Sequence, residues 1–219
     1  MMKKEELQAI AAQLKHPTGE KGIEMANMMH ETNINMTRHS VQNLHVISGN
    51  AILELGHGNA GHLEYVLEQA QDLTYYGLEM SELMCQEAQQ INIAFVAKKQ
   101  AHFSLYNGTN IPFEEASFDK IFTVNTIYFW QEPEKLLSEI YRVLKPEGTF
   151  CITFAEESFM KQLPFTQFEF NLYSTEKAES LIEKTAFQVV HKETLTEKVK
   201  SKMGELVDRA FTTLVLGKR

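Results

Sequence analysis

Residues 52 to 61 of the chain read Ile52-Leu53-Glu54-Leu55-Gly56-His57-Gly58-Asn59-Ala60-Gly61. An apolar run with an acidic residue near its end leads into a glycine-rich turn, after which a helical pattern begins. Glycine has no Cβ, so the backbone of such a turn bends tightly and lets a ligand come close. The order of strand, glycine turn and helix is therefore typical of a loop that binds a nucleotide cofactor.

Two interpretations of this loop are open on its own residues. Gly56-x-Gly58-x-x-Gly61 matches a dinucleotide fingerprint, with Glu79 about 20 residues further on, where an acid would bind a ribose. Glu54-x-Gly56-x-Gly58 instead resembles the first motif of S-adenosylmethionine (SAM) methyltransferases, in which the acid lies near the amino-acid end of the ligand. The rest of the chain has to distinguish these readings.

Composition limits the possible classes of protein. The 219 residues suit one domain with a terminal extension. A net charge of −8 argues against a nucleic-acid backbone as the main partner, because phosphate binding requires basic surface. No apolar run reaches the roughly 18 residues of a membrane span. Cys85 and Cys151 follow no metal spacing and are expected to be reduced, buried thiols of a cytoplasmic protein.

From residue 51 onward, short apolar runs alternate with helical patterns. Strands are predicted over residues 51–55, 73–78, 101–105, 118–124 and 149–154. Strands separated by helices imply a parallel sheet that is covered on both faces. The last two runs, 187–193 and 210–217, have no helix between them and predict a hairpin at the sheet edge. The predicted fold class is α/β: a Rossmann-like doubly wound sheet, mostly parallel, with a terminal antiparallel hairpin.

Residues 1–50 lack any strand pattern and predict an N-terminal helical cap on a main domain of residues 51–219. Apolar residues recur at helical spacing up to Leu14, and His16-Pro17-Thr18-Gly19 ends this helix. A second helical segment holds Ile23 to Met29, and a third runs from Met36 through Leu44. Helices are also predicted over residues 61–71 and 174–186, and Ser81 is expected to be the N-cap of a helix that extends to Ile91. Pro146-Glu147-Gly148 is expected to end the helix that precedes the fifth strand.

Five segments, in this order, resemble class I SAM-dependent methyltransferases of the small-molecule, methyltransferase-11-like type. They are Ile52-Leu53-Glu54-Leu55-Gly56-His57-Gly58, Tyr75-Tyr76-Gly77-Leu78-Glu79-Met80-Ser81, Asn107-Gly108-Thr109-Asn110-Ile111-Pro112-Phe113 with Ser117-Phe118-Asp119, Ile127-Tyr128-Phe129-Trp130-Gln131-Glu132-Pro133, and Leu137-x-Glu139-Ile140-x-Arg142-Val143-Leu144-Lys145-Pro146-x-Gly148. The resemblance covers residues 51–154 closely and implies SAM as the cofactor. A nicotinamide cofactor would explain the loop and Glu79 but none of the later segments.

The resemblance also implies which residues contact the cofactor. They are Glu54, Gly56, His57 and Gly58 of the first loop, Glu79 and Met80 at the second strand end, Asn107 and Gly108 of the adenine loop, and Asn125 after the fourth strand. For His57 we expect a backbone contact, with the imidazole facing solvent or the cap. Two positions depart from the family pattern: its third loop glycine falls at Ala60, and its adenine-loop acid falls at Asn107, whose carbonyl can still accept from the adenine amino group.

Methyl transfer from a sulfonium is an in-line displacement, for which the protein supplies orientation, desolvation and in some cases a base. The chain has no Asn-Pro-Pro-Tyr after the fourth strand, where Asn125-Thr126-Ile127-Tyr128 stands, which argues against amines of nucleic-acid bases as acceptors. Candidate acid or base groups are Tyr128 and His39, with wall packing and surface exposure as their alternative roles. His30 of the cap could also reach a substrate, and no metal-site spacing is present.

The acceptor pocket is predicted between the sheet edge and two mobile covers. One is the methionine-rich cap, and the other is a lid segment over residues 155–172 that is rich in phenylalanine. The phenylalanines predict either an apolar substrate wall or packing of the cap. The predicted function is transfer of a methyl group to a small-molecule acceptor, without nucleic-acid or membrane partners. A SAM-binding sensor without turnover and an NAD-binding protein are the alternatives.

Overall fold

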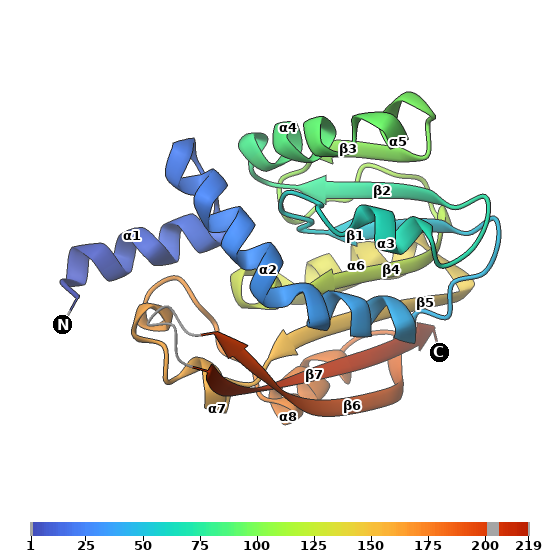
Figure 1. The fold of residues 1–219 in the computed structure, drawn as a ribbon. Helices are drawn as coiled ribbons and strands as arrows, with labels where there is room; N and C mark the ends of the chain where they lie inside the picture. The colour runs from blue at the N-terminus through green and yellow to red at the C-terminus, as the bar shows by residue number, and fades with distance from the viewer. Residues whose placement is uncertain (1, 201–205, 219) are drawn as a thin grey trace.

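The computed structural model describes residues 2–200 and 206–218. Its centre is a seven-stranded sheet with the strand order β3-β2-β1-β4-β5-β7-β6 (Figure 1). The strands are β1 (Ala51–Leu55), β2 (Thr74–Glu79), β3 (Ala101–Leu105), β4 (Phe118–Val124), β5 (Leu144–Ala155), β6 (Phe187–Lys200) and β7 (Leu206–Lys218). Residues 1, 201–205 and 219, which belong to the predicted cap and main domain, lie outside the described residues.

The pairing of the strands confirms the predicted mixed sheet. β3, β2, β1, β4 and β5 are parallel neighbours, whereas β7 runs antiparallel to both β5 and β6. The predicted start of the fifth strand, at residue 149, was wrong. β5 begins at Leu144 and includes Pro146 to Gly148, which were expected to end a helix. Leu144 pairs with Phe118, and a register shift between Phe118 and Lys120 absorbs the extra residues before Thr149 resumes the ladder.

Helices cover both faces of the sheet (Figure 1). The helical segments are α1 (Lys4–Lys15), α2 (Gly19–Asn43), α3 (Leu63–Leu67), α4 (Glu82–Ile91), α5 (Ile93–Ala97), η1 (Ile127–Phe129), α6 (Pro133–Val143), α7 (Glu157–Met160), η2 (Pro164–Gln167) and α8 (Thr175–Ile182). One buried cluster contains side chains of α2, α3 and α4, and the other contains side chains of α6, α7 and α8. Ile52 of β1 belongs to the first cluster and Leu53 to the second, as the alternation of a strand requires.

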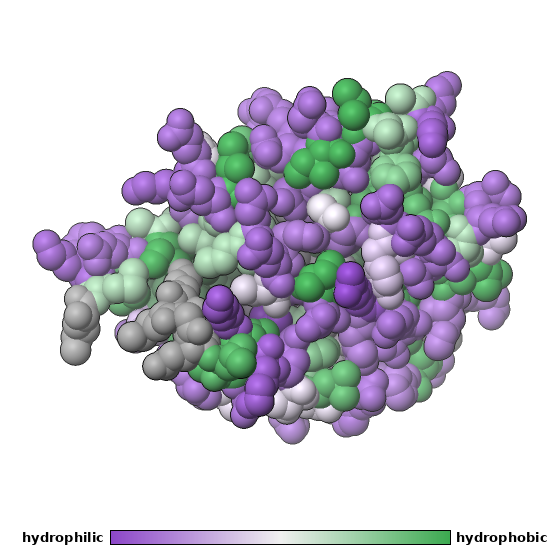
Figure 2. Space-filling model, in the orientation of Figure 1, coloured by the Kyte–Doolittle hydropathy of each residue, from purple (hydrophilic) through white to green (hydrophobic). Residues whose placement is uncertain are grey.

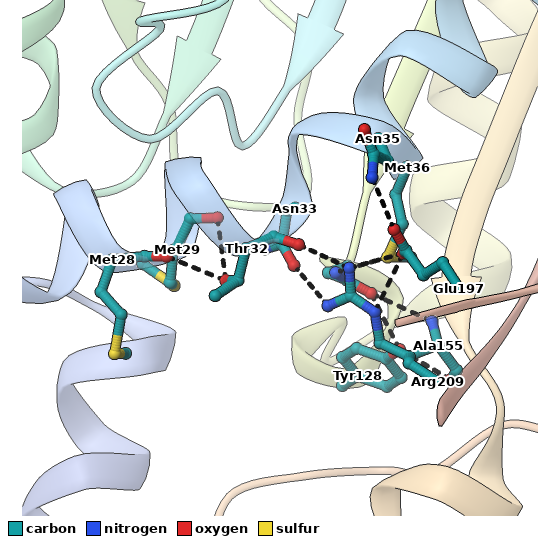
Figure 3. Close-up of polar contacts among 11 residues, drawn as sticks. Met28, Met29, Thr32, Asn33, Asn35, Met36, Tyr128, Ala155, Glu197 and Arg209 are labelled. Carbon is teal, nitrogen blue, oxygen red and sulfur yellow. Dashed lines mark hydrogen bonds and ion pairs between the residues drawn. The ribbon is translucent and has the colours of Figure 1, made fainter. Parts of the chain in front are cut away.

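α2 is one helix of 25 residues, so the expectation of two separate segments was wrong. The polar residues in the middle of this helix have partners on the β6–β7 hairpin. The side-chain Oδ1 of Asn33 accepts from Arg209, and the side-chain Nδ2 of Asn35 donates to Glu197 (Figure 3). Because no proline or further glycine follows Gly22 in the helix, nothing in its backbone interrupts the hydrogen bonds.

Two shorter helices also differ from expectation. α3 spans only Leu63–Leu67, and α8 spans Thr175–Ile182. The last residues of both predicted helices, 68–71 and 183–186, form turns and bends instead.

The N-terminal helices are attached to the sheet domain at the start of α4. Ser81 is the N-cap of α4, as predicted, and its Oγ accepts from the Met84 amide at 3.2 Å. The same hydroxyl donates to the Pro17 carbonyl at 2.7 Å, in the turn between α1 and α2. One buried side chain thus caps a helix and holds the cap against the domain.

On the face of the molecule that Figure 2 shows, hydrophobic residues are interspersed among hydrophilic ones. Within the described residues, no helix combines the length and apolar character needed to cross a membrane.

Candidate functional site

A pocket lies at the carboxyl ends of β1, β2 and β4, where the strand order changes direction between β1 and β4. It holds about 1140 Å³ of space, counting the part that is open to solvent. Ligands of open α/β sheets bind at this position. The N-terminal helices and their connecting turn form the opposite wall, with Leu14, Lys15, Pro17, Ala26, Met29, His30, Asn33 and Thr37.

The glycine turn after β1 forms the floor of the pocket. Gly56 has a φ of 74°, and a Cβ there would lie 2.5 Å from Cγ2 of Thr126, so this position requires glycine. Gly58 has a φ of 57°, and no atom lies within 4 Å of the position of a Cβ. Its bare backbone therefore faces open space, as a close-approaching ligand requires. Ala60 has a φ of 48°, so the residue at the family's third glycine position takes the glycine conformation at a cost of roughly 1–2 kcal/mol.

Glu54 is buried at the end of β1, with one carboxylate oxygen engaged. Its Oε2 accepts from Tyr75 Oη at 2.5 Å and lies 2.7 Å from His62 Nε2. Burial first, and the Glu54 charge second, raise the pKa of Tyr75, so the phenol stays protonated and donates. Among the described residues both contacts use Oε2, so Oε1 is the oxygen available to a ligand in the pocket.

Glu79 lies at the end of β2 and joins two loops of the site. Its Oε2 accepts from the Gly58 amide at 3.1 Å, and its Oε1 accepts from the amides of Met80 and Ser81 at 2.7 and 3.1 Å. Three backbone donors hold the carboxylate in one orientation beside the glycine turn. A carboxylate has lone pairs beyond these three, which remain available to hydroxyl donors of a ligand.

The expected orientation of the His57 imidazole was wrong. The ring faces neither solvent nor the cap but lies buried beside β2, with Nδ1 2.8 Å from the Gly58 carbonyl oxygen and its centroid 5.0 Å from that of Phe103. A Cβ on Gly77 would lie 2.5 Å from this ring, so the glycine makes room for it. Burial lowers the pKa of His57, so the ring is neutral near pH 7.

Asn107, Gly108 and Met80 form the wall next to Glu79. Oδ1 of Asn107 accepts from the amides of Thr109 and Asn110 at 3.0 and 2.8 Å, which closes the loop on itself. The carbonyl expected to receive an adenine amino group is therefore occupied within its own loop. The Met80 sulfur would lie 2.7 Å from a Cβ on Gly108, so it packs over the glycine backbone.

The structure brings Asn125 into the pocket but not the two candidate acid or base residues. Asn125 has a φ of 57°, and its Oδ1 accepts from the Ala155 amide and from Tyr128 Oη. Tyr128 is buried, also donates to the Ala155 carbonyl, and is absent from the pocket lining. His39 is held by Thr213 and Glu193 on the hairpin, away from the pocket. The contacts of both side chains are those of packing residues.

Three of the lining residues that the sequence did not single out as ligand contacts lie in loops. His62 follows the glycine turn, Thr126 follows β4, and Trp130 follows η1. The Trp130 Nε1 donates to Thr126 Oγ1 at 3.1 Å. No spacing marks these residues, because their approach depends on how the loops close. Residues 155–172 contribute nothing to the described lining; Phe170 instead packs on Phe129 with ring centroids 4.7 Å apart.

The residues of this pocket fit S-adenosylmethionine. The open space above Gly58 admits a ligand to the backbone, and two carboxylates, Glu54 and Glu79, face a molecule that carries a sulfonium, an amino group and ribose hydroxyls. Within residues 2–200 and 206–218, no group of three or more His, Cys, Asp or Glu side chains is placed to hold a metal ion.

Comparisons with known proteins identify the family of this domain. Residues 53–152 match the methyltransferase domain family. A Bacillus subtilis protein described as uncharacterized methyltransferase YdaC is 27% identical over 128 residues, which are 58% of this chain and 67% of that protein. Another curated relative is the fatty-acid O-methyltransferase of Mycolicibacterium smegmatis. It is 26% identical over 132 residues, which are 57% of this chain and only 46% of that protein.

A solved structure shares the fold over almost the whole chain. It is a complex between the Haloferax volcanii Trm112 methyltransferase activator and a methyltransferase, with a TM-score of 0.74, 17% identity and coverage of 97% of this chain and 98% of that one. Together, the family match, the sheet order and the glycine turn beside Glu79 lead to one conclusion. The methyltransferase-domain match over residues 53–152 and the shared fold support a class I methyltransferase with S-adenosylmethionine as the cofactor.

Proposed function

We propose that this protein transfers a methyl group from SAM to a small-molecule acceptor. The observation that carries the proposal is the Glu79 carboxylate, which is held by three backbone amides beside the bare backbone of Gly58. When bound, SAM supplies the electrophilic methyl group on a sulfonium, so the protein mainly has to bind, align and exclude water. The fatty-acid relative also acts, by its name, on a small molecule.

Each wall of the pocket has a distinct role in this proposal. The Gly56–Gly58 turn and Glu54 hold the amino-acid end of SAM, Glu79 accepts from the ribose hydroxyls, and Asn107, Gly108 and Met80 surround the base. Asn125 lies where the fourth strand ends, next to the expected path of the methyl group. Buried residues of α2 and the loop after β4 close the other side of the pocket and limit the access of water.

Trp130 gives a direct test, because it is the only tryptophan of the chain and lines the pocket. Titration with SAM, S-adenosylhomocysteine (SAH) and NAD should change its fluorescence for the first two and not for NAD. Calorimetry on the same samples should give matching affinities. A response to NAD alone would contradict the cofactor roles proposed for these residues.

Turnover is tested separately by release of SAH from SAM in the presence of candidate acceptors. A protein that binds SAM but releases no SAH with any acceptor would be a binding protein, and the transfer function proposed above would be wrong.

A further inference from the structure

Apolar side chains line part of the pocket. They include Met29 of α2, Phe129 at the end of η1 and Trp130 directly after it. Trp130 is only 6% exposed. These side chains suit a molecule with an apolar body.

The charged groups that line the pocket have partners or are assigned to the cofactor. Lys15 forms an ion pair with Glu169 at 2.6 Å, Glu54 contacts His62, and Glu79 accepts from three amides. A charged acceptor would lose hydration without gaining an opposite charge, which costs several kcal/mol. Among the described lining residues, the arrangement therefore favours an acceptor that enters uncharged.

His30 is the titratable side chain of α2 that lines the pocket. Its ring packs over Gly61, where a Cβ would lie 3.1 Å from Cε1, and stacks on His62 with centroids 6.2 Å apart. His62 is in turn held by Glu54, so His30 lies above the residues that mark the amino-acid end of the cofactor. Unlike Tyr128 and His39, this imidazole lines the pocket.

The surroundings of His30 favour its neutral form. Burial lowers the pKa of the imidazole below its ordinary value of about 6.5, and the nearby His62 and Arg38 lower it further. Glu31 and Glu54 act in the opposite direction but do not outweigh these effects. Near pH 7 the ring therefore carries a free lone pair and accepts a proton.

On the basis of the function proposed above, we propose that His30 is the general base of the transfer and that the acceptor is an uncharged, apolar molecule with a hydroxyl or thiol group. A ring nitrogen of His30 takes the proton of the O–H or S–H group while the oxygen or sulfur attacks the methyl carbon. The new bond to carbon forms as the carbon–sulfonium bond breaks, and its electron pair stays on the sulfur of SAH. The imidazolium then releases the proton to water.

The first test measures binding through the fluorescence of Trp130 in protein saturated with SAH. The probes are para-propylphenol, para-propylbenzoate and para-propylbenzylamine, which share one apolar body and differ in charge at pH 7. The phenol should bind at least tenfold more tightly than the anion and the cation. Equal or tighter binding of either charged probe would overturn the assignment of the acceptor class.

The second test measures the role of His30. SAM and para-propylphenol should give methylated product, with kcat rising with pH through the pKa of His30. His30→Gln should lower kcat at pH 7 by about 10²- to 10⁴-fold, the range of general base catalysis, and remove that rise. Its affinity for SAH should stay within threefold of the wild type. His191→Gln, at an exposed position of β6, is the matched control and should change neither quantity.

A third measurement does not depend on turnover. In histidine-labelled wild-type protein, NMR titration should give His30 a pKa below 6.5, and its signals, assigned by their loss in His30→Gln, should shift when SAH is added. A ring that stays protonated at pH 7, or signals unchanged by SAH, would exclude His30 as the base.

The outcomes separate this proposal from the function on which it depends. If SAH does not bind, the proposed function fails. If SAH binds and SAM transfers methyl groups to other acceptors but not to the phenol, the acceptor class is wrong. If the phenol is methylated equally well by His30→Gln, the acceptor class stands and His30 is not the base.

Discussion

The guanidinium of Arg209 lies 2.7 Å from the carboxylate of Glu197, and the side chains are only 7% and 12% exposed (Figure 3). The same guanidinium donates to the Thr32 carbonyl at 2.6 Å and to the Asn33 side chain at 2.9 Å. One cation of β7 thus connects an acid of β6 with the middle of α2. This contact attaches the long helix of the cap to the terminal hairpin.

Removal of the Arg209 charge should therefore lower the free energy of unfolding strongly. Arg209→Met leaves Glu197 buried without its counter-charge, which typically costs about 3–5 kcal/mol of unfolding free energy. Arg209→Met combined with Glu197→Met should recover part of this loss. Lys198→Met is the control, because its pair with Asp208 is exposed and should contribute under about 1 kcal/mol. Urea denaturation followed by circular dichroism measures each value; a similar small loss for Arg209→Met and Lys198→Met would contradict this role.

Of the two helices of the cap, only α1 should change its amide exchange when ligand binds. Because α2 is attached at Arg209 and Ser81 holds the turn before it, we predict amide exchange in its central part as slow as in the central strands. α1 ends at Lys15, which lines the pocket and pairs with Glu169, and should exchange faster and slow down when SAH is added. Hydrogen exchange with mass spectrometry tests this. Slow exchange in α1 without a response to SAH would mean a fixed layer and no lid.

Glu79→Ala should weaken SAM binding strongly. It removes a charged acceptor, worth about 1.5–3 kcal/mol, or roughly 10- to 150-fold in affinity, and it also releases the Gly58 amide. Calorimetry with SAM and SAH gives the change. Glu82→Ala, at an exposed position in the first turn of α4, should bind as the wild type does. Equal affinities of the two variants would remove Glu79 from the site.

Asn107 should support SAM binding by holding its loop in one conformation. Asn107→Ala loses the acceptor of the Thr109 and Asn110 amides and should weaken SAM by about 1 kcal/mol, roughly fivefold. Asn107→Asp keeps that acceptor and adds charge, so its affinity should equal or exceed that of the wild type. A folded aspartate variant that binds much more weakly than Asn107→Ala would show that the side-chain amide itself is required.

Protonation of His57 should lower the free energy of unfolding as the pH falls. Its folded pKa is lowered by burial, so the unfolded chain binds more protons below about pH 6.5, and this share of the stability is present above that pH and lost as pH falls. Urea denaturation between about pH 7.5 and about pH 5 should show a smaller loss for His57→Gln than for the wild type. His191→Gln should keep the wild-type dependence. Identical slopes for His57→Gln and the wild type would contradict a neutral, buried His57.

Several features of the fold follow from local pattern alone. Alternating apolar runs with glycine, proline and serine at their ends predicted the strands over 101–105 and 118–124 and the helix cap at Ser81, because periodicity and capping depend on neighbouring residues. The glycine turn with Glu79 at the next strand end was visible for the same reason. The length of α2 was not, since the partners of its polar residues lie more than 160 positions away in the chain.

The details of the site were decided by contacts between segments distant in sequence. The ring of His57 lies inside the fold because Gly77 of the next strand leaves space for it. Tyr128 is held by a hydrogen bond to Ala155, and His39 is held by its contact with Glu193 of the hairpin. His30 reached the pocket because α2 crosses the glycine turn. A sequence specifies which side chains are available and how each segment bends, whereas burial, and with it protonation and access to a ligand, depends on which segments meet. The sequence was therefore enough to predict the resemblance to methyltransferases and the cofactor. The groups proposed to face the acceptor could be identified only from the tertiary structure.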